Sequence, residues 1–136
     1  MKKVLLGLLL VFTTSFASAQ GRTVEPICKT INGPTNYGAL QLAECNGEYY
    51  LKFRDAHYVY AAVYEVVELG SRENVEYLLS VIENYRYGDH ELSNGLRFKA
   101  TKVVGGKSSV IYFYKVGAQA QAWSIRAWKK VLTIKN

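Results

Sequence analysis

Apolar residues between Gly70 and Gly88 recur with the spacing of an α-helix, at positions i, i+3, i+4 and i+7. These residues are Val75, Leu78, Leu79 and Ile82. Ser71 stands just before the first turn and offers a side-chain oxygen as an N-cap. The pattern therefore predicts one main helix over about 71–87, with Gly88 as its stop.

Two stretches with period-2 alternation, 39–45 and 48–54, flank the dipeptide Asn46-Gly47. Asn-Gly is the favoured pair for a two-residue type I′ turn, so these stretches predict a β-hairpin. The turn sets the register, and one face of the hairpin is then apolar while the other is wet. The predicted pairs on the apolar face are Leu42 with Leu51 and Leu40 with Phe53.

A second hairpin is predicted from 96–104 and 107–116, around Gly105-Gly106. Its alternation again separates a core face from an outer face. The expected core pairs are Phe98 with Phe113 and Ala100 with Ile111. The expected outer pairs are Arg97 with Tyr114 and Lys99 with Tyr112.

The remaining segments are less regular. Residues 58–69 are rich in Tyr and Val but alternate poorly, so a central strand, a bulged long strand or a helical turn at Ala61-Ala62 would each fit. A strand leading into the helix is favoured. Residues 117–121 are small and predict a linker. The stretch 123–134 fits either a basic edge strand or a short helix capped by Ser124, and a strand entering a short terminal helix is favoured. Residues 85–91 predict a polar aromatic connection.

These elements together predict an α+β domain. We expect one antiparallel sheet of about five to six strands, built from the two hairpins. The main helix should pack on one face of this sheet, with a short C-terminal helix as an addition. The two halves of the chain look alike in outline, although their sequences are too different to indicate a repeat.

Residues 1–19 have the features of a secretory signal peptide: a basic start, a short apolar run and small residues before the cleavage site. The predicted organisation is a signal peptide (1–19), an extended N-terminal arm (20–38) and a single α+β domain (39–136). The apolar run is too short to span a bilayer, and no later segment is long enough. We expect a bacterial protein that is exported to the periplasm or secreted.

The chain has two cysteines, Cys28 and Cys45. An even pair in a small exported domain usually forms a disulfide, which here would tie the N-terminal arm across the exposed side of the first hairpin. Two free thiols or part of a metal site are the alternatives, but no histidine lies near either cysteine in the sequence. We therefore expect a structural disulfide, no metal site and no cofactor.

Charge is strongly segregated along the chain. Residues 20–91 carry six basic and all eleven acidic side chains, whereas residues 92–136 carry nine basic side chains and no acid. Such a distribution predicts a basic surface that meets an anionic partner, for example an envelope component or an acidic protein. A solvated basic face balanced by the acidic half of the chain is the plainer interpretation. Nucleic acid is not expected as a partner of an exported protein.

No recognised catalytic motif is present in the sequence. An enzyme would have to use His57 or His90, each of which has carboxylates nearby in the chain. A small secreted hydrolase is therefore an alternative hypothesis, and the main prediction is that the protein is not an enzyme.

The better candidate for function is a binding surface, because tyrosine with arginine is typical of binding sites. The candidate binding residues are Arg97, Lys99, Tyr112, Tyr114, Arg126, Lys129 and Lys130. Exposed Tyr–Lys pairs also simply stabilise strands, so a structural role competes with this prediction. A further alternative is peripheral attachment to an anionic membrane through Trp123, Trp128 and nearby lysines. The sequence makes no prediction of the oligomeric state.

Overall fold

The computed structural model describes residues 28–103 and 108–135. The predicted signal peptide, the first part of the N-terminal arm and the turn at Gly105-Gly106 lie outside these residues. Four strands form the first antiparallel sheet: β1 (Cys28–Asn32), β2 (Gln41–Cys45), β3 (Glu48–Arg54) and β4 (Tyr64–Gly70). Four more form the second: β5 (Gly88–Glu91), β6 (Arg97–Lys102), β7 (Ser109–Phe113) and β8 (Ala118–Gln121).

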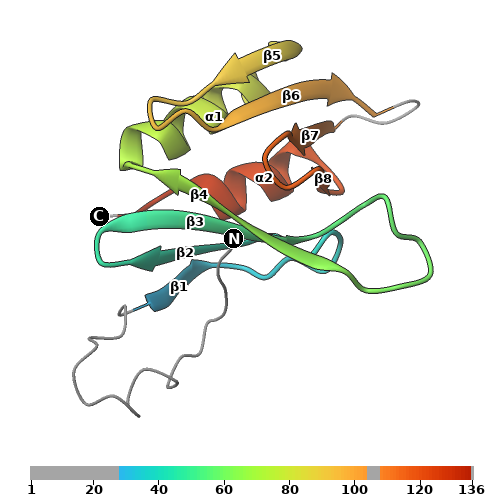
Figure 1. Ribbon diagram of the computed structural model, residues 1–136, viewed down its shortest axis with the longest axis horizontal. Helices are drawn as coiled ribbons and strands as arrows, with labels where there is room; N and C mark the ends of the chain where they lie inside the picture. Colours follow the sequence, from blue (N-terminus) through green and yellow to red (C-terminus); the bar gives the residue numbers. More distant parts are fainter. Residues whose placement is uncertain (1–27, 104–107, 136) are drawn as a thin grey trace.

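The α+β class with antiparallel pairing is confirmed, but the prediction of one sheet is wrong. Each group of four strands is followed by a helix, α1 (Arg72–Glu83) after the first sheet and α2 (Ile125–Leu132) after the second. The two helices pack on each other between the sheets (Figure 1). α1 also contacts β3 and β4, while α2 contacts β1 and β2. The two halves of the chain therefore repeat the same order of elements.

The main helix begins where the sequence predicts. The Ser71 side chain accepts a hydrogen bond from the Asn74 amide, and Val75, Leu78 and Ile82 are fully buried. The helix ends at Glu83 rather than near residue 87, because Tyr85 adopts a positive φ of 55° and turns the chain away. Gly88 consequently begins β5 and does not act as the helix stop.

Both predicted hairpins are present in the expected register. Leu42 pairs with Leu51 across β2 and β3, and Phe98 pairs with Phe113 across β6 and β7. Lys99 also lies opposite Tyr112 on the outer side of the second hairpin. The Asn46-Gly47 turn has positive φ angles at both residues, 51° and 84°, as a type I′ turn requires.

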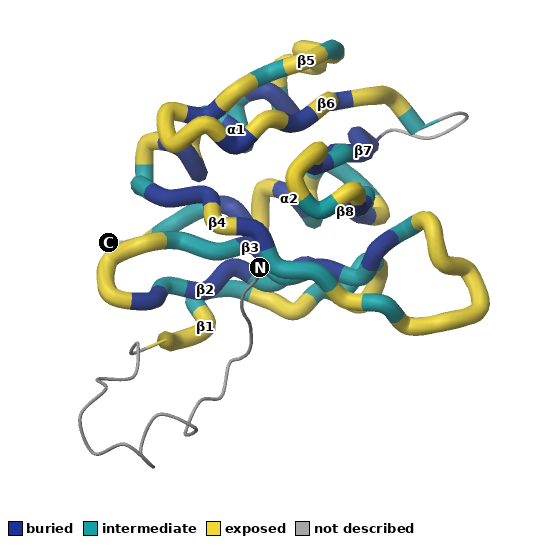
Figure 2. Tube along the Cα trace, in the orientation of Figure 1, coloured by how far each residue is buried: buried dark blue, intermediate teal, exposed yellow. Residues whose placement is uncertain are grey.

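Two predictions are corrected by the structure: the start of one strand, and a segment that was expected to be a linker. The expected strand over 58–69 begins only at Tyr64, and residues 57–62 form an exposed loop between β3 and β4 (Figures 1 and 2). The expected linker over 117–121 contains β8, whose alanines Ala118 and Ala120 are fully buried. Alternation of Ala with Gln is the period-2 pattern of a strand, but alanine has a low strand propensity and conceals it.

The disulfide between Cys28 and Cys45 is confirmed. It does not clamp an arm across the face of the sheet, because the two cysteines are direct partners in neighbouring strands. β1 instead extends the first sheet as an edge strand beside β2. The disulfide thus fastens an edge strand of only five residues.

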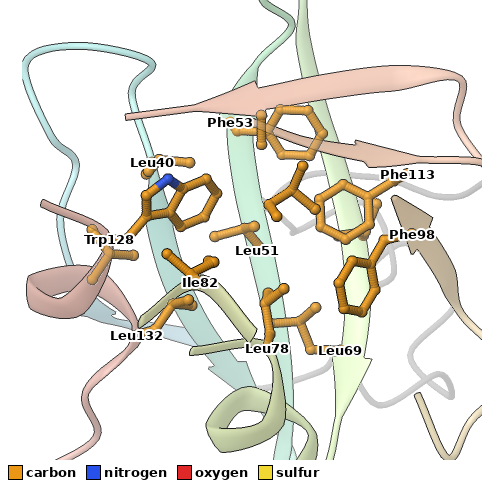
Figure 3. Close-up of a cluster of buried hydrophobic side chains, with 14 of the residues drawn as sticks. Leu40, Leu51, Phe53, Leu69, Leu78, Ile82, Phe98, Phe113, Trp128 and Leu132 are labelled. Carbon is orange, nitrogen blue, oxygen red and sulfur yellow. The ribbon is translucent and has the colours of Figure 1, made fainter. Parts of the chain in front are cut away.

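A single core joins the two sheets. Phe53 of β3 packs against Phe113 of β7, with 5.6 Å between ring centroids. Figure 3 shows these rings with Leu78 and Ile82 of α1 and with Trp128 and Leu132 of α2. The indole N–H of Trp128 donates to the Ser109 carbonyl at 3.0 Å, which connects α2 to the second sheet.

Candidate functional site

The structure divides the seven predicted binding residues into two groups. The sheet-face cluster consists of Arg97 and Lys99 of β6, Tyr112 of β7, and Tyr114 just after β7. The other three residues, Arg126, Lys129 and Lys130, lie on α2. They therefore do not extend the sheet-face cluster, because α2 packs between the sheets.

The sheet-face cluster contains the expected cation–π pair. The Arg97 guanidinium lies 4.7 Å from the Tyr114 ring centroid, and the Tyr112 and Tyr114 rings meet edge to face at 5.2 Å. Such an exposed pair contributes about 0.5–1 kcal/mol to stability. These contacts hold the side chains of the cluster against one another, so a structural role explains the cluster as well as a binding role does.

Carboxylates from β5 lie opposite the cations of this cluster. Asp89 is the cross-strand partner of Lys99, and Glu91 is the partner of Arg97. The Tyr114 hydroxyl donates to Asp89 Oδ1 at 2.5 Å, and this bond is the main reason why the pKa of Tyr114 is raised. Asp89 and Glu91 therefore bring two negative charges next to Lys99 and Arg97, although no ion pair joins these four side chains within the described residues.

The basic residues of α2 line a second surface feature, which we name the basic hollow. α2 is amphipathic, with Trp128, Val131 and Leu132 buried and its charged residues on the solvent side. The hollow is open and has a volume of about 400 Å³. Its lining residues are Asn32, Arg126, Lys129, Lys130, Thr133 and Lys135.

Four cations thus surround one hollow, and within the described residues one of them, Lys129, has an ion-pair partner. Lys129 Nζ lies 3.6 Å from a carboxylate oxygen of Glu83 at the end of α1. Among the residues that the structure describes, no carboxylate forms an ion pair with Arg126, Lys130 or Lys135. An anion entering the hollow would relieve the repulsion among these cations.

Lysines near the end of a helix commonly interact with its free carbonyl groups. Here other side chains donate hydrogen bonds to carbonyl groups at the end of α2. The Asn32 amide donates to the Val131 carbonyl at 2.9 Å and to the Thr133 carbonyl at 2.8 Å. Arg72 donates at 3.2 Å to the carbonyl of Ile134, which follows the end of the helix. Because these carbonyl groups already accept hydrogen bonds, the lysine ammonium groups are not required to cap the helix. The partial negative charge at this end of the helix is also reduced, so it repels a bound anion less.

Three lining residues of the hollow were not predicted from the sequence: Asn32, Thr133 and Lys135. Asn32 is the most distant of them in the chain. It ends β1, and its side chain reaches α2, which lies 99 residues further along the chain. In the sequence it belongs to an Asn-Gly turn signal, which describes the local backbone and not a distant contact.

His57 is oriented by a buried carboxylate. Asp55 is 3% exposed, and its Oδ1 lies 3.0 Å from His57 Nδ1. The same oxygen accepts from the backbone amides of His57 and Gln119, so it also connects the β3–β4 loop to β8. His57 packs edge to face on Tyr112. Within the described residues, no Ser, Thr or Cys side chain is hydrogen-bonded to this histidine.

His90 is held in the fold by both ring nitrogens. Nδ1 lies 2.9 Å from the Tyr77 hydroxyl, and Nε2 lies 2.7 Å from the Arg86 carbonyl. Its ring stacks on Phe98 at 5.3 Å. Its neighbours Asp89 and Glu91 point to the other face of β5, so they cannot orient it as a general base.

The two tryptophans have opposite environments. Trp128 is 0% exposed, so the idea that it contacts a membrane is wrong. Trp123 is 77% exposed and meets Tyr37 edge to face at 5.6 Å. Only Trp123 is available to an external partner.

Within residues 28–103 and 108–135, no helix is both long and apolar enough to cross a membrane. The same residues contain no cluster of three or more His, Cys, Asp or Glu side chains arranged to hold a metal ion. Comparison of the chain with models of protein families, with curated proteins and with solved structures finds no match.

Proposed function

We propose that this protein is an exported, non-enzymatic binding protein that recognises an anionic partner through the basic hollow. The observation that supports it best is the set of four cations around one hollow, of which only Lys129 is ion-paired to a residue in the described part of the chain. The cations of the sheet-face cluster, by contrast, already lie opposite Asp89 and Glu91. We therefore place binding on α2 rather than on the second sheet.

Export is supported by the signal-like residues 1–19 and by the disulfide between Cys28 and Cys45. Disulfides persist mainly in oxidising compartments such as the periplasm or the cell exterior. In such a compartment the available anions include phosphorylated envelope components, acidic polysaccharides and acidic proteins. All of them present negative groups that the hollow could accept.

Charge reversal in the hollow should weaken binding to heparin, which serves as a soluble polyanion probe. We expect Lys130→Glu with Lys135→Glu to lower the affinity about tenfold or more, because each exposed ionic contact contributes up to about 1 kcal/mol. The slope of log K against log salt should also become shallower. Isothermal titration calorimetry at several salt concentrations measures both quantities.

Lys99→Glu with Lys102→Glu is the matched control, because both lysines are exposed on β6 and the net charge changes equally. This control should lower the affinity less than the reversal in the hollow does. Equal losses would show that only the total charge matters. A larger loss in the β6 variant would place binding on the second sheet and contradict the proposal.

A further inference from the structure

Tyr37 and Trp123 form an exposed aromatic pair, and both are close in the chain to residues of the basic hollow. Trp123 stands between β8 and α2, and Tyr37 stands in the connection between β1 and β2. Trp123 is 77% exposed and Tyr37 is 42% exposed, yet their rings touch. The pair therefore offers aromatic surface to an external partner while each ring also supports the other.

The backbone brings these two segments together closely. Gly38 has a φ of +77°, and a Cβ added to it would overlap the carbonyl oxygen of Gln121. Gly38 thus permits the Tyr37 segment to lie directly against the end of β8, two residues before Trp123. This close approach of the two backbone segments therefore fixes the position of the aromatic pair.

The pair and the hollow both draw on two parts of the chain. One is the end of β1 with the connection that follows it, and the other is the connection from β8 into α2. Asn32 lines the hollow and immediately precedes the connection that carries Tyr37. Arg126 lines the hollow and follows Trp123 by three residues. Residues 33–40 and 117–124 contain no Asp, Glu, Lys or Arg. The uncharged aromatic pair is therefore linked through short stretches of chain to Asn32 and Arg126 of the basic hollow.

We infer that this combined face docks on the headgroup layer of an anionic lipid bilayer. Tyrosine and tryptophan favour the boundary between water and hydrocarbon, where Trp123 and Tyr37 would lie. Arg126, Lys130 and their neighbours would then meet the lipid phosphates, whose charge is complementary. This inference rests on the proposed function, because it names the partner of the same hollow. A soluble anion would use the hollow but would leave the aromatic pair without a role.

The two tryptophans permit a direct optical test. Vesicles of phosphatidylcholine containing phosphatidylglycerol, some with brominated acyl chains, are added to the protein at low salt. On docking, the emission of Trp123 should shift to the blue and should be quenched by the brominated lipid. Trp128 is buried, and its N–H is bound to the Ser109 carbonyl, so it contributes a constant background. Vesicles of phosphatidylcholine alone should bind at least tenfold more weakly.

Two variants separate this inference from the proposed function. Trp123→Ala should abolish the blue shift and weaken vesicle binding several-fold, but it should leave heparin binding unchanged. Lys130→Glu with Lys135→Glu should weaken both. Heparin binding by the unmodified protein without vesicle binding would overturn the lipid inference alone, and would favour a soluble anion or an acidic protein. Vesicle binding without quenching of Trp123 would also overturn it. Failure to bind either probe would refute the proposed function itself.

Discussion

Replacement of Trp128 by alanine should lower the free energy of unfolding by about 3–5 kcal/mol. The side chain is fully buried, and it belongs to the core that joins α2 to both sheets (Figure 3). Its removal leaves a cavity and leaves the Ser109 carbonyl without its buried donor. Because a small domain is stable by only about 5–15 kcal/mol, this variant should be close to unfolding at 37 °C.

Urea denaturation followed by circular dichroism measures this loss. Trp123→Ala is the control, because it removes the same kind of side chain from an exposed position. We expect its stability to remain within about 0.5 kcal/mol of the unmodified protein. Similar losses in the two variants would mean that α2 does not fill the space between the sheets as described.

Removal of the disulfide should produce the second large loss. Cys28 and Cys45 are 17 residues apart. A disulfide that closes a loop of this length lowers the conformational entropy of the unfolded chain, which stabilises the fold by about 3 kcal/mol. The variant Cys28→Ala with Cys45→Ala should therefore unfold at a clearly lower urea concentration. Among the described strands β1 pairs only with β2, so this pairing alone holds it weakly.

This variant should also weaken anion binding, because β1 supplies Asn32 to the end of α2. Asn32→Ala in the oxidised protein is the companion variant, since it breaks the contact with α2 and leaves the disulfide intact. We expect it to reduce heparin affinity with a smaller loss of stability. A cysteine double variant with unchanged stability and unchanged heparin affinity would contradict the structural role given to β1.

Local features of the fold were predictable because each depends on a few neighbouring residues. Asn46-Gly47 determines a two-residue turn, and that turn determines that Leu42 lies opposite Leu51. Ser71 and Ser124 both cap helices, since each side chain accepts from the amide three residues later. The pairing of Phe98 with Phe113 was predicted in the same way, from alternation together with a hairpin centred on Gly105-Gly106.

The number of sheets was not predictable in the same way. Alternation predicts strands and hairpins, but it does not say whether two hairpins share one ladder of hydrogen bonds. Here the two sheets meet near the end of β3, where the Ala56 amide donates to the Gln119 carbonyl and Asp55 accepts from the Gln119 amide. These contacts join residues more than sixty positions apart, and no local sequence pattern around either residue predicts them.

The candidate site was predicted only in part for a related reason. The sequence identified the basic residues Arg126, Lys129 and Lys130, but it grouped them with the sheet-face cluster. It treated residues 85–91 as a connection, whereas four of them form β5 and bring Asp89 and Glu91 opposite the cations of β6. A short polar strand has little apolar periodicity, so its effect on the charge of the sheet became visible only in the fold.

The central claim is that an anionic group binds at the basic hollow. Its most direct test is a titration of the ¹⁵N-labelled protein with inorganic pyrophosphate, followed by amide chemical shifts. We predict saturable shifts that are largest in residues 126–135 and at Asn32, with small shifts at Arg97, Lys99, Tyr112 and Tyr114. Shifts concentrated on those four residues, or no saturable shift at any position, would contradict the claim.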